Sequence, residues 1–293
     1  MSGVTNPELL ERLACPACGG DYKTVTASNL ICLGCGKKVR LLHDKPVFTP
    51  VPPGMRAAPK LVRGPDEGSP WRRANWRFLE AAIKSLPKEA VILDFGAGHG
   101  DFSEVLGKHA TIALDVFPYD EIDVVCDLGK TIPFKKGSFD AIVLMNVLEH
   151  IPQPEKLMKA LAALLRPTGS LIVAVPFLLK LHQQPYDFYR YSHYQLENMG
   201  REAELDMVKI EGYYDPVLLF RESAQNIRSF VLPALPSIRR KTSRLLLEAI
   251  SACVSGIQRL IGYGYIRNPK DEKSLYPIGY HVIYRAGSKK RKN

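Results

Sequence analysis

Residues 91–100, Val-Ile-Leu-Asp-Phe-Gly-Ala-Gly-His-Gly, constrain the fold more than any other part of the chain. The apolar run at their start is typical of a buried parallel strand. The glycines that follow indicate a tight turn into a helix whose N-terminus faces a ligand. Asp115 ends the next apolar run, where nucleotide-binding α/β folds place an acid for ribose hydroxyls. These features predict an α/β fold with a ligand at the glycine turn.

The spacing of the glycines distinguishes two classes of ligand. A dinucleotide site needs the pattern G-x-G-x-x-G, which seats a pyrophosphate on the helix N-terminus. Here Asp94 precedes glycines at 96, 98 and 100. A carboxylate at that place repels a pyrophosphate and suits a cationic group. The alternative is a glycine turn in some other α/β protein.

Further motifs follow in a fixed order, and together they resemble one family. Residues 91–176 resemble the type 11 class of S-adenosylmethionine (SAM)-dependent methyltransferases. The matching features are Asp94-x-Gly-x-Gly-x-Gly100, Asp115, Cys126-Asp-Leu128, Pro133-Phe134, Ser138-Phe-Asp140, Val147-Leu-Glu-His-Ile151 and Arg166-Pro-x-Gly169. The resemblance implies a Rossmann-like, doubly wound, mostly parallel seven-stranded sheet. Thr168 replaces a helix-ending glycine that is common there, a departure that affects the turn and not the chemistry.

The resemblance also implies SAM as the cofactor, whose ammonium and sulfonium would suit the acid before the glycines. It assigns the methionine moiety to the glycine loop, the ribose to Asp115, and the adenine to Asp127 and Leu128. The cofactor-binding residues expected on this basis are Asp94, Gly96, Ala97, Gly98, Gly100, Asp115, Asp127, Leu128 and Asn146.

Four cysteines near the N-terminus indicate a metal site. Cys15 and Cys18 form one C-x-x-C pair and Cys32 and Cys35 the other, with glycines beside both pairs. Four thiolates at this spacing predict a closed, tetrahedral and structural Zn²⁺ site. The alternatives are disulfide bonds between these cysteines, or iron bound by the same four sulfurs. The segment resembles the short zinc ribbons that precede some methyltransferase domains, with residues 41–48 as its closing strand.

The chain divides into three parts on composition. Residues 1–50 are expected to form the zinc ribbon, and the proline-rich residues 51–70 an extended linker. Residues 71–293 are expected to form the methyltransferase domain, with an amphipathic helix at 71–86 and a first helical turn over 101–104. A helical insertion is expected at about 213–272, where two helical patterns are broken by prolines.

The acceptor is expected beside residues 176–192, a polar and aromatic loop after the last parallel strand. His182, Asp187 and Arg190 are the predicted catalytic residues. A hydroxyl acceptor needs a general base, for which His182 and His150 are the candidates. His182 is favoured, with Asp187 orienting it. In the alternative, Asp187 and Arg190 only pair to hold the loop. The loop resembles a His…Pro-x-Asp-Phe-x-Arg-Tyr segment of methyltransferases associated with polysaccharide and glycoconjugate synthesis. That resemblance implies a hydroxyl on a sugar, a lipid-linked glycan or another small molecule as the acceptor.

The net charge of +10 favours an anionic partner. Arg239, Arg240, Lys241 and Arg244 lead an apolar helical stripe, a pattern that suits an anionic membrane surface; a lid packed over the substrate or on a partner chain is the alternative. Neither a signal peptide nor a membrane-spanning helix is expected, so the location is predicted to be cytoplasmic, with peripheral attachment to the inner membrane surface open. Two other functions stay open: an rRNA base methyltransferase that uses its ribbon on RNA, and a non-catalytic SAM-binding scaffold.

Overall fold

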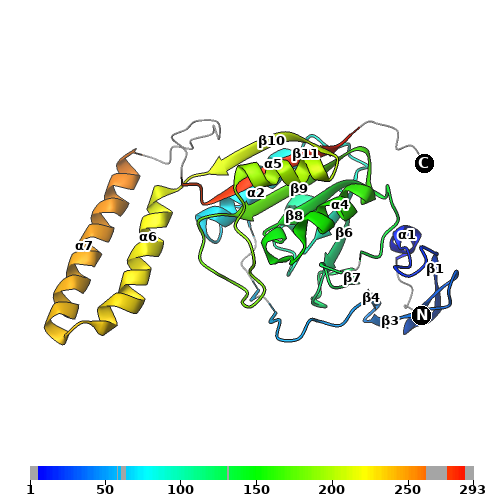
Figure 1. Ribbon diagram of the computed structural model, residues 1–293, viewed down its shortest axis with the longest axis horizontal. Helices are drawn as coiled ribbons and strands as arrows, with labels where there is room; N and C mark the ends of the chain where they lie inside the picture. Colours follow the sequence, from blue (N-terminus) through cyan, green and yellow to red (C-terminus); the bar gives the residue numbers. More distant parts are fainter. Residues whose placement is uncertain (1–5, 58, 61–63, 131, 262–275, 288–293) are drawn as a thin grey trace.

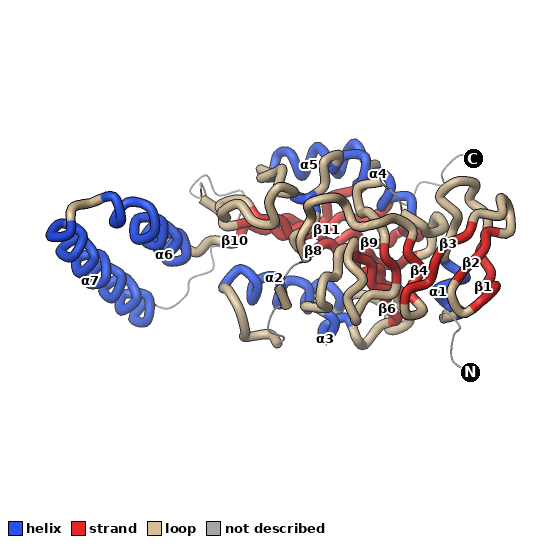
Figure 2. Tube along the Cα trace, turned by 90° about the horizontal axis from the view of Figure 1, so that it is seen from below, coloured by secondary structure: helices blue, strands red, loops and turns tan. Residues whose placement is uncertain are grey.

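The structure, a computed structural model, describes residues 6–57, 59–60, 64–130, 132–261 and 276–287. Its strands form one eleven-stranded sheet in the order β1-β2-β3-β4-β7-β6-β5-β8-β9-β11-β10. Helices cover both faces of the sheet, and a helical hairpin stands away from it at one end (Figures 1 and 2).

Seven of these strands make the predicted Rossmann-like sheet. The parallel strands are β5 (Val91–Phe95), β6 (Ala110–Asp115), β7 (Val124–Val125), β8 (Phe139–Met145) and β9 (Leu165–Pro176). The antiparallel strand β11 (Gly279–Ala286) lies between β9 and β10 (Leu205–Tyr213), which is the edge strand. The strand order reverses between β5 and β8, and open α/β sheets bind ligands at the carboxyl ends of strands beside such a reversal. The predicted fold class is therefore confirmed.

Two helical layers bury the two faces of this sheet (Figure 2). Leu93 of β5 packs in the core cluster under α4 (Pro154–Leu164) and α5 (His193–Glu202). Its neighbour Ile92 packs in the cluster under α2 (Pro70–Ile83) and α3 (Ser103–Leu106). Successive strand residues point to opposite faces, so a strand like β5, which is buried along its whole length, fits only between two layers. The expected helix at 101–104 starts two residues later, and Asp101 precedes it.

The ribbon is built from α1 (Pro7–Arg12), β1 (Tyr22–Thr26), β2 (Asn29–Cys32), β3 (Lys38–Leu42) and β4 (Lys45–Val47). The prediction of a single strand at 41–48 is wrong. This segment is a hairpin of β3 and β4, because His43 and Asp44 turn the chain at positive φ (48° and 64°).

The ribbon joins the sheet instead of standing apart from it. Val47 of β4 pairs in parallel with Val125 of β7. Leu13 forms a bridge with Phe134, and both lie in the same core cluster as the α4–α5 face of the sheet. One continuous core therefore spans the ribbon and the large domain.

Two further segments frame the sheet. Within the described part of residues 51–69 there is no helix or strand. The C-terminal insertion forms a hairpin of α6 (Pro216–Asn226), a π-helical turn η2 (Ile227–Val231), a 3₁₀ turn η3 (Leu232–Ala234) and α7 (Ser237–Ile261) (Figure 1). The rest of the expected insertion, 262–272, lies outside the described residues. Among the described helices none has the length and apolarity needed to cross a bilayer.

Candidate functional site

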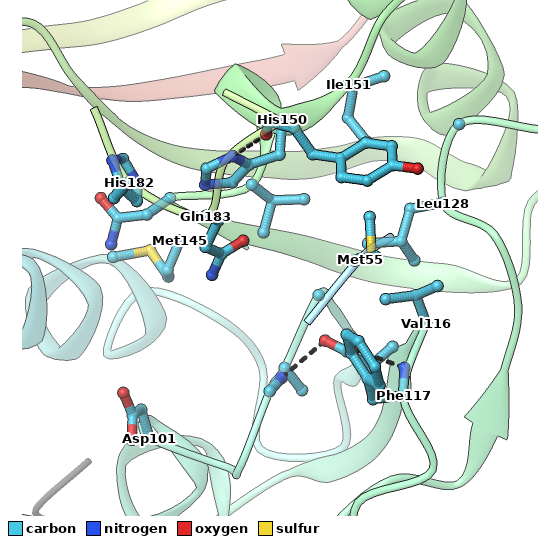
Figure 3. A pocket seen from close by; sticks show the side chains of 18 of the residues that line it. Met55, Asp101, Val116, Phe117, Leu128, Met145, His150, Ile151, His182 and Gln183 are labelled. Carbon is cyan, nitrogen blue, oxygen red and sulfur yellow. Dashed lines mark hydrogen bonds between the residues drawn. The ribbon is translucent and has the colours of Figure 1, made fainter. Parts of the chain in front are cut away.

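A cavity of about 830 Å³ lies at the carboxyl ends of β5, β6 and β8 (Figure 3). Residues from the glycine loop, the linker and the loop after β9 line it together. Of the predicted site residues, those that line the cavity are Asp94, Gly96, Ala97, Gly98, Asp115, Asp127, Leu128, Asn146 and His182. Gly100, Asp187 and Arg190 are not among its lining residues. One cavity thus brings the predicted cofactor residues and His182 together.

The glycine loop is shaped by close backbone approach. Gly96 has φ of +81°, and a Cβ built on it would lie 2.5 Å from Cγ2 of Val147. Gly98 has φ of +57° with open space where a side chain would be. Its amide donates a hydrogen bond to Asp115 Oδ2 at 3.0 Å. Only glycine fits at position 96. Its lack of a side chain lets the loop lie directly against Val147, in the segment that follows β8.

Two buried acids give this end of the cavity its charge preference. Asp94 is 5% exposed, and burial, together with the nearby Asp115 and Asp101, raises its pKa to about 7. Burial also raises the pKa of Asp115, while the amides of Phe117 and Gly98 lower it. A cation placed beside Asp94 would favour its ionised form. This end of the cavity therefore fits a cationic ligand.

The predicted adenine side is partly occupied by local contacts. Asp127 Oδ1 accepts a hydrogen bond from the Gly129 amide at 3.0 Å, and Oδ2 pairs with Lys130 at 2.9 Å. Leu128 presents an apolar side chain to the cavity (Figure 3). Asn146, in the left-handed region at φ of 59°, accepts a hydrogen bond from Trp71 Nε1 at 2.8 Å.

The loop after β9 is held by an ion pair. Arg190 contacts Asp187 through Nη1–Oδ1 at 2.6 Å and Nη2–Oδ2 at 2.8 Å. Asp187 Oδ2 also accepts a hydrogen bond from the His182 amide at 2.8 Å. These contacts hold the loop and place His182 at the cavity. Asp187 and Arg190 do not line the cavity themselves, and their role as catalytic residues stays a prediction.

The sequence analysis gave no role to Glu149, which lies behind the two histidines of this region. Glu149 is fully buried, and its Oε1 lies 3.6 Å from His182 Nε2 and 3.7 Å from His150 Nε2. Its carboxylate raises the pKa of His182. The signal available in the sequence was its place beside His150 in the Val147-Leu-Glu-His-Ile151 motif.

The four cysteines of the ribbon converge on one point. Cys15 Sγ lies 3.7 Å from Cys35 Sγ, and Cys18 Sγ lies 3.4 Å from Cys32 Sγ. All four sulfurs form one group of metal-ligand spacing. A Cβ on Gly20 would lie 3.1 Å from Cys32 Sγ. Four sulfurs bonded to one tetrahedral Zn²⁺ at about 2.3 Å would lie at similar separations, so the cluster fits zinc.

Comparison with known proteins agrees with the geometry. Residues 71–208 match the family model described as a methyltransferase domain. The ubiquinone biosynthesis O-methyltransferase of Coxiella burnetii (strain Dugway 5J108-111) is 34% identical over 110 residues, 32% of this chain and 46% of that protein. The protein of the same name from Xanthomonas axonopodis pv. citri is 35% identical over 131 residues, which cover 38% of this chain and 52% of that protein. The chain spans about half the length of these curated relatives.

Solved structures with a related arrangement were also found. The [4+2]-cyclase SpnF is 16% identical, with a TM-score of 0.49 over 80% of this chain and 88% of that chain. A putative sarcosine dimethylglycine methyltransferase from Galdieria sulphuraria is 17% identical, with a TM-score of 0.46 over 74% of this chain and 86% of that chain.

Proposed function

Residues 71–208 belong to the class I SAM-dependent methyltransferases, and on that premise we propose that this chain methylates a hydroxyl oxygen of a small-molecule acceptor. The observation that supports it most is the single cavity, which joins the buried acids Asp94 and Asp115 at one end to His150 and His182 at the other. An acid-lined cofactor end suits a cationic methyl donor, and an imidazole at the acceptor end can take up the proton of a hydroxyl.

The cofactor end fits SAM through its charges and its close backbone. Asp94 would bind the ammonium of the methionine moiety, and Asp115 the ribose hydroxyls, while the loop at Gly96 and Gly98 lets the ligand approach the backbone. Bound SAM supplies an activated methyl group on a sulfonium. The protein's part is to align the acceptor oxygen with that group and to exclude water.

The acceptor end favours an oxygen nucleophile. The curated relatives carry the name O-methyltransferase, which supports oxygen over nitrogen or carbon. We propose a sugar or lipid-linked glycan as the acceptor class. Tyr186 lines the cavity and can face a ring, whereas Tyr191 is 3% exposed and belongs to the core. The prediction that His182 acts as the general base stays a prediction; its Nε2 is the atom that this role needs.

We propose Zn²⁺ for the four-cysteine cluster, and a cytoplasmic location in which these thiols stay reduced. The cysteines close the site with four ligands, so the ion has a structural part.

The hairpin supports an anionic membrane surface as a further partner. Phe230 near its tip is 77% exposed, and Leu246 on α7 is 63% exposed. The exposed cations Arg239, Arg240 and Lys241 stand between them in the chain. A second copy docked here would bring like charges together, whereas acidic lipid headgroups would neutralise them and accept the apolar side chains.

Vesicle sedimentation tests the membrane partner. The protein is expected to sediment with vesicles containing phosphatidylglycerol and not with pure phosphatidylcholine vesicles. A Phe230→Ser/Leu246→Ser variant should lose most of this binding, while Val25→Ser, a change at an exposed apolar side chain on the ribbon, should not. Equal binding by all three proteins would contradict the proposal.

The activity is tested with methyl-labelled SAM and fractionated cell extract. Label is expected in a glycan or lipid fraction, in a form that hydriodic acid releases as methyl iodide, as it does from methyl ethers. Label in RNA would replace the proposal with the rRNA alternative. Cofactor binding with no label in any fraction would favour the scaffold.

A further inference from the structure

Three potential metal ligands meet at the acceptor end of the cavity. Glu149 and His150 belong to the short 3₁₀ turn η1 (Leu148–His150) after β8, and His182 comes from the loop after β9. Their ligand atoms all lie within 4.8 Å of one another. Figure 3 shows the rings of His150 and His182 next to each other on one wall of the pocket. Chain segments far apart in sequence therefore converge on one point.

Two of the three residues, Glu149 and His150, carry buried ligand atoms that lack hydrogen-bond partners within the described part of the chain. Both carboxylate oxygens of the fully buried Glu149 are unpartnered, and so is His150 Nε2. The separations of 3.6 and 3.7 Å from Glu149 Oε1 to the two imidazole nitrogens are too long for hydrogen bonds. An ionised carboxylate buried without a partner is costly, and the nearby Arg190 is already engaged by Asp187. The site calls for a cationic partner.

The other nitrogen of each histidine is held by a group that accepts hydrogen bonds. His150 Nδ1 donates to the carbonyl of Tyr186 at 2.5 Å. His182 Nδ1 lies 3.3 Å from the Lys180 carbonyl and 3.3 Å from Asp187 Oδ2. A proton fixed on Nδ1 leaves the lone pair on Nε2, directed at the shared point. Metal-binding histidines are oriented in this way.

We propose that Glu149 Oε1, His150 Nε2 and His182 Nε2 bind a divalent transition-metal ion, Zn²⁺ by its donor set. Ligands about 2.0–2.2 Å from a tetrahedral ion lie roughly 3.4 Å apart, close to the separations from Glu149 Oε1. Two imidazoles and one carboxylate are a common zinc set, and one ion would satisfy two of the orphaned atoms, Glu149 Oε1 and His150 Nε2. The remaining coordination position faces the cavity, which both histidines line.

The inference rests on the proposed function and specifies how the acceptor is activated. An acceptor hydroxyl bound at the open position has its pKa lowered, and its proton passes to solvent. The oxygen then forms a bond to the methyl carbon as the carbon–sulfur bond breaks, which yields a methyl ether and S-adenosylhomocysteine. In this account His182 binds the ion instead of acting as the base. The acceptor is accordingly one whose hydroxyl can coordinate zinc.

Metal content of the full-length protein tests the site. After saturation with zinc and exhaustive dialysis, the wild-type chain is expected to retain two zinc ions, one at the cysteines and one here. His182→Ala and the isosteric Glu149→Gln should each retain one. Gln183→Ala, at the neighbouring lining residue, is the matched control and should retain two. Zinc-edge X-ray absorption should show mixed sulfur and nitrogen/oxygen ligation in the wild type and sulfur alone in His182→Ala.

One zinc per wild-type chain with sulfur ligation alone would overturn the inference and return His182 to the role of base. Two zinc ions in both site variants would overturn it as well. SAM titration of the same samples keeps the two proposals separate. Loss of a zinc with SAM binding retained supports the metal site. Failure of the wild type to bind SAM refutes the proposed function whatever the zinc count.

Discussion

At the scale of single residues, Asp94, the proposed partner of the SAM ammonium, should make cofactor binding depend on pH. Its pKa is raised to about 7 by burial and by Asp115 and Asp101, so near neutrality part of the free protein carries a proton there. A cationic ligand needs the carboxylate, so SAM affinity should rise with pH and fall up to about tenfold per unit below pH 7. Calorimetry between about pH 6 and pH 8 measures this. Asp94→Asn should bind weakly with a flat profile; a flat profile in the wild type would contradict the assignment.

His281 makes stability depend on pH in the same direction. It is stacked between Trp71 and Phe78, its Nε2 lies 2.7 Å from Asn75 Oδ1, and burial lowers its pKa to about 3. Between that value and its unfolded value of 6.5, the unfolded chain binds the extra proton. The contribution of the neutral, buried His281 to the free energy of unfolding is therefore complete above pH 6.5 and declines as the pH falls toward 3.

The loss should reach about 2 kcal/mol of unfolding free energy between pH 6.5 and about pH 5, at 1.36 kcal/mol per unit. Urea unfolding at several pH values measures it, with His281→Phe as the variant that cannot titrate. An equal slope in wild type and variant would show that His281 is not the cause.

The glycine loop offers a matched pair of substitutions. Gly96→Ala and Gly98→Ala both place a Cβ at positive φ, which costs about 1 kcal/mol each. Only the first would collide with Val147, which adds about 1–3 kcal/mol and displaces the loop. Urea unfolding and SAM titration should therefore show the greater loss in Gly96→Ala. Equal losses would mean that the contact with Val147 does not shape the site.

At the scale of elements, the ribbon and the large domain should unfold together. β4 pairs with β7, and Leu13 and Leu30, both fully buried, share a core cluster with Phe134. Loss of the proposed zinc from the cysteines would expose part of that core, so the whole protein should lose stability. Calorimetric unfolding of Cys32→Ser is expected to show one transition at lower temperature. A main transition unchanged from wild type would mean that the ribbon folds independently.

At this scale the sequence predicts some elements better than others. The cores of β5 and β9, residues 91–93 and 171–175, were predictable because a buried parallel strand reads as an apolar run. The first half of β9 was not, since Arg166, Pro167 and Thr168 interrupt that pattern. The pairing of Val47 with Val125 was not, since it joins short strands distant in sequence and leaves no periodic signal. The hairpin at His43 and Asp44 was missed because neither residue is the glycine usual at positive φ.

At the scale of the whole molecule, the sequence located the cavity but not its acceptor chemistry. Asp94, Asp115 and His182 stand in recognisable motifs, and the fold brings them to one cavity. Glu149 could not be distinguished from a solvated acid. Its burial depends on the loop after β9, where the amides of Phe188 and Tyr189 bond to its carbonyl. Burial of this kind is a product of tertiary packing and has no local signature.

The central claim is that the cavity binds SAM, and calorimetric titration of the purified, zinc-loaded protein with SAM and S-adenosylhomocysteine tests it most directly. The account predicts micromolar binding to the wild type, lost in Asp94→Ala and in Asp115→Ala while both variants remain folded. No binding by the folded wild-type protein would contradict it.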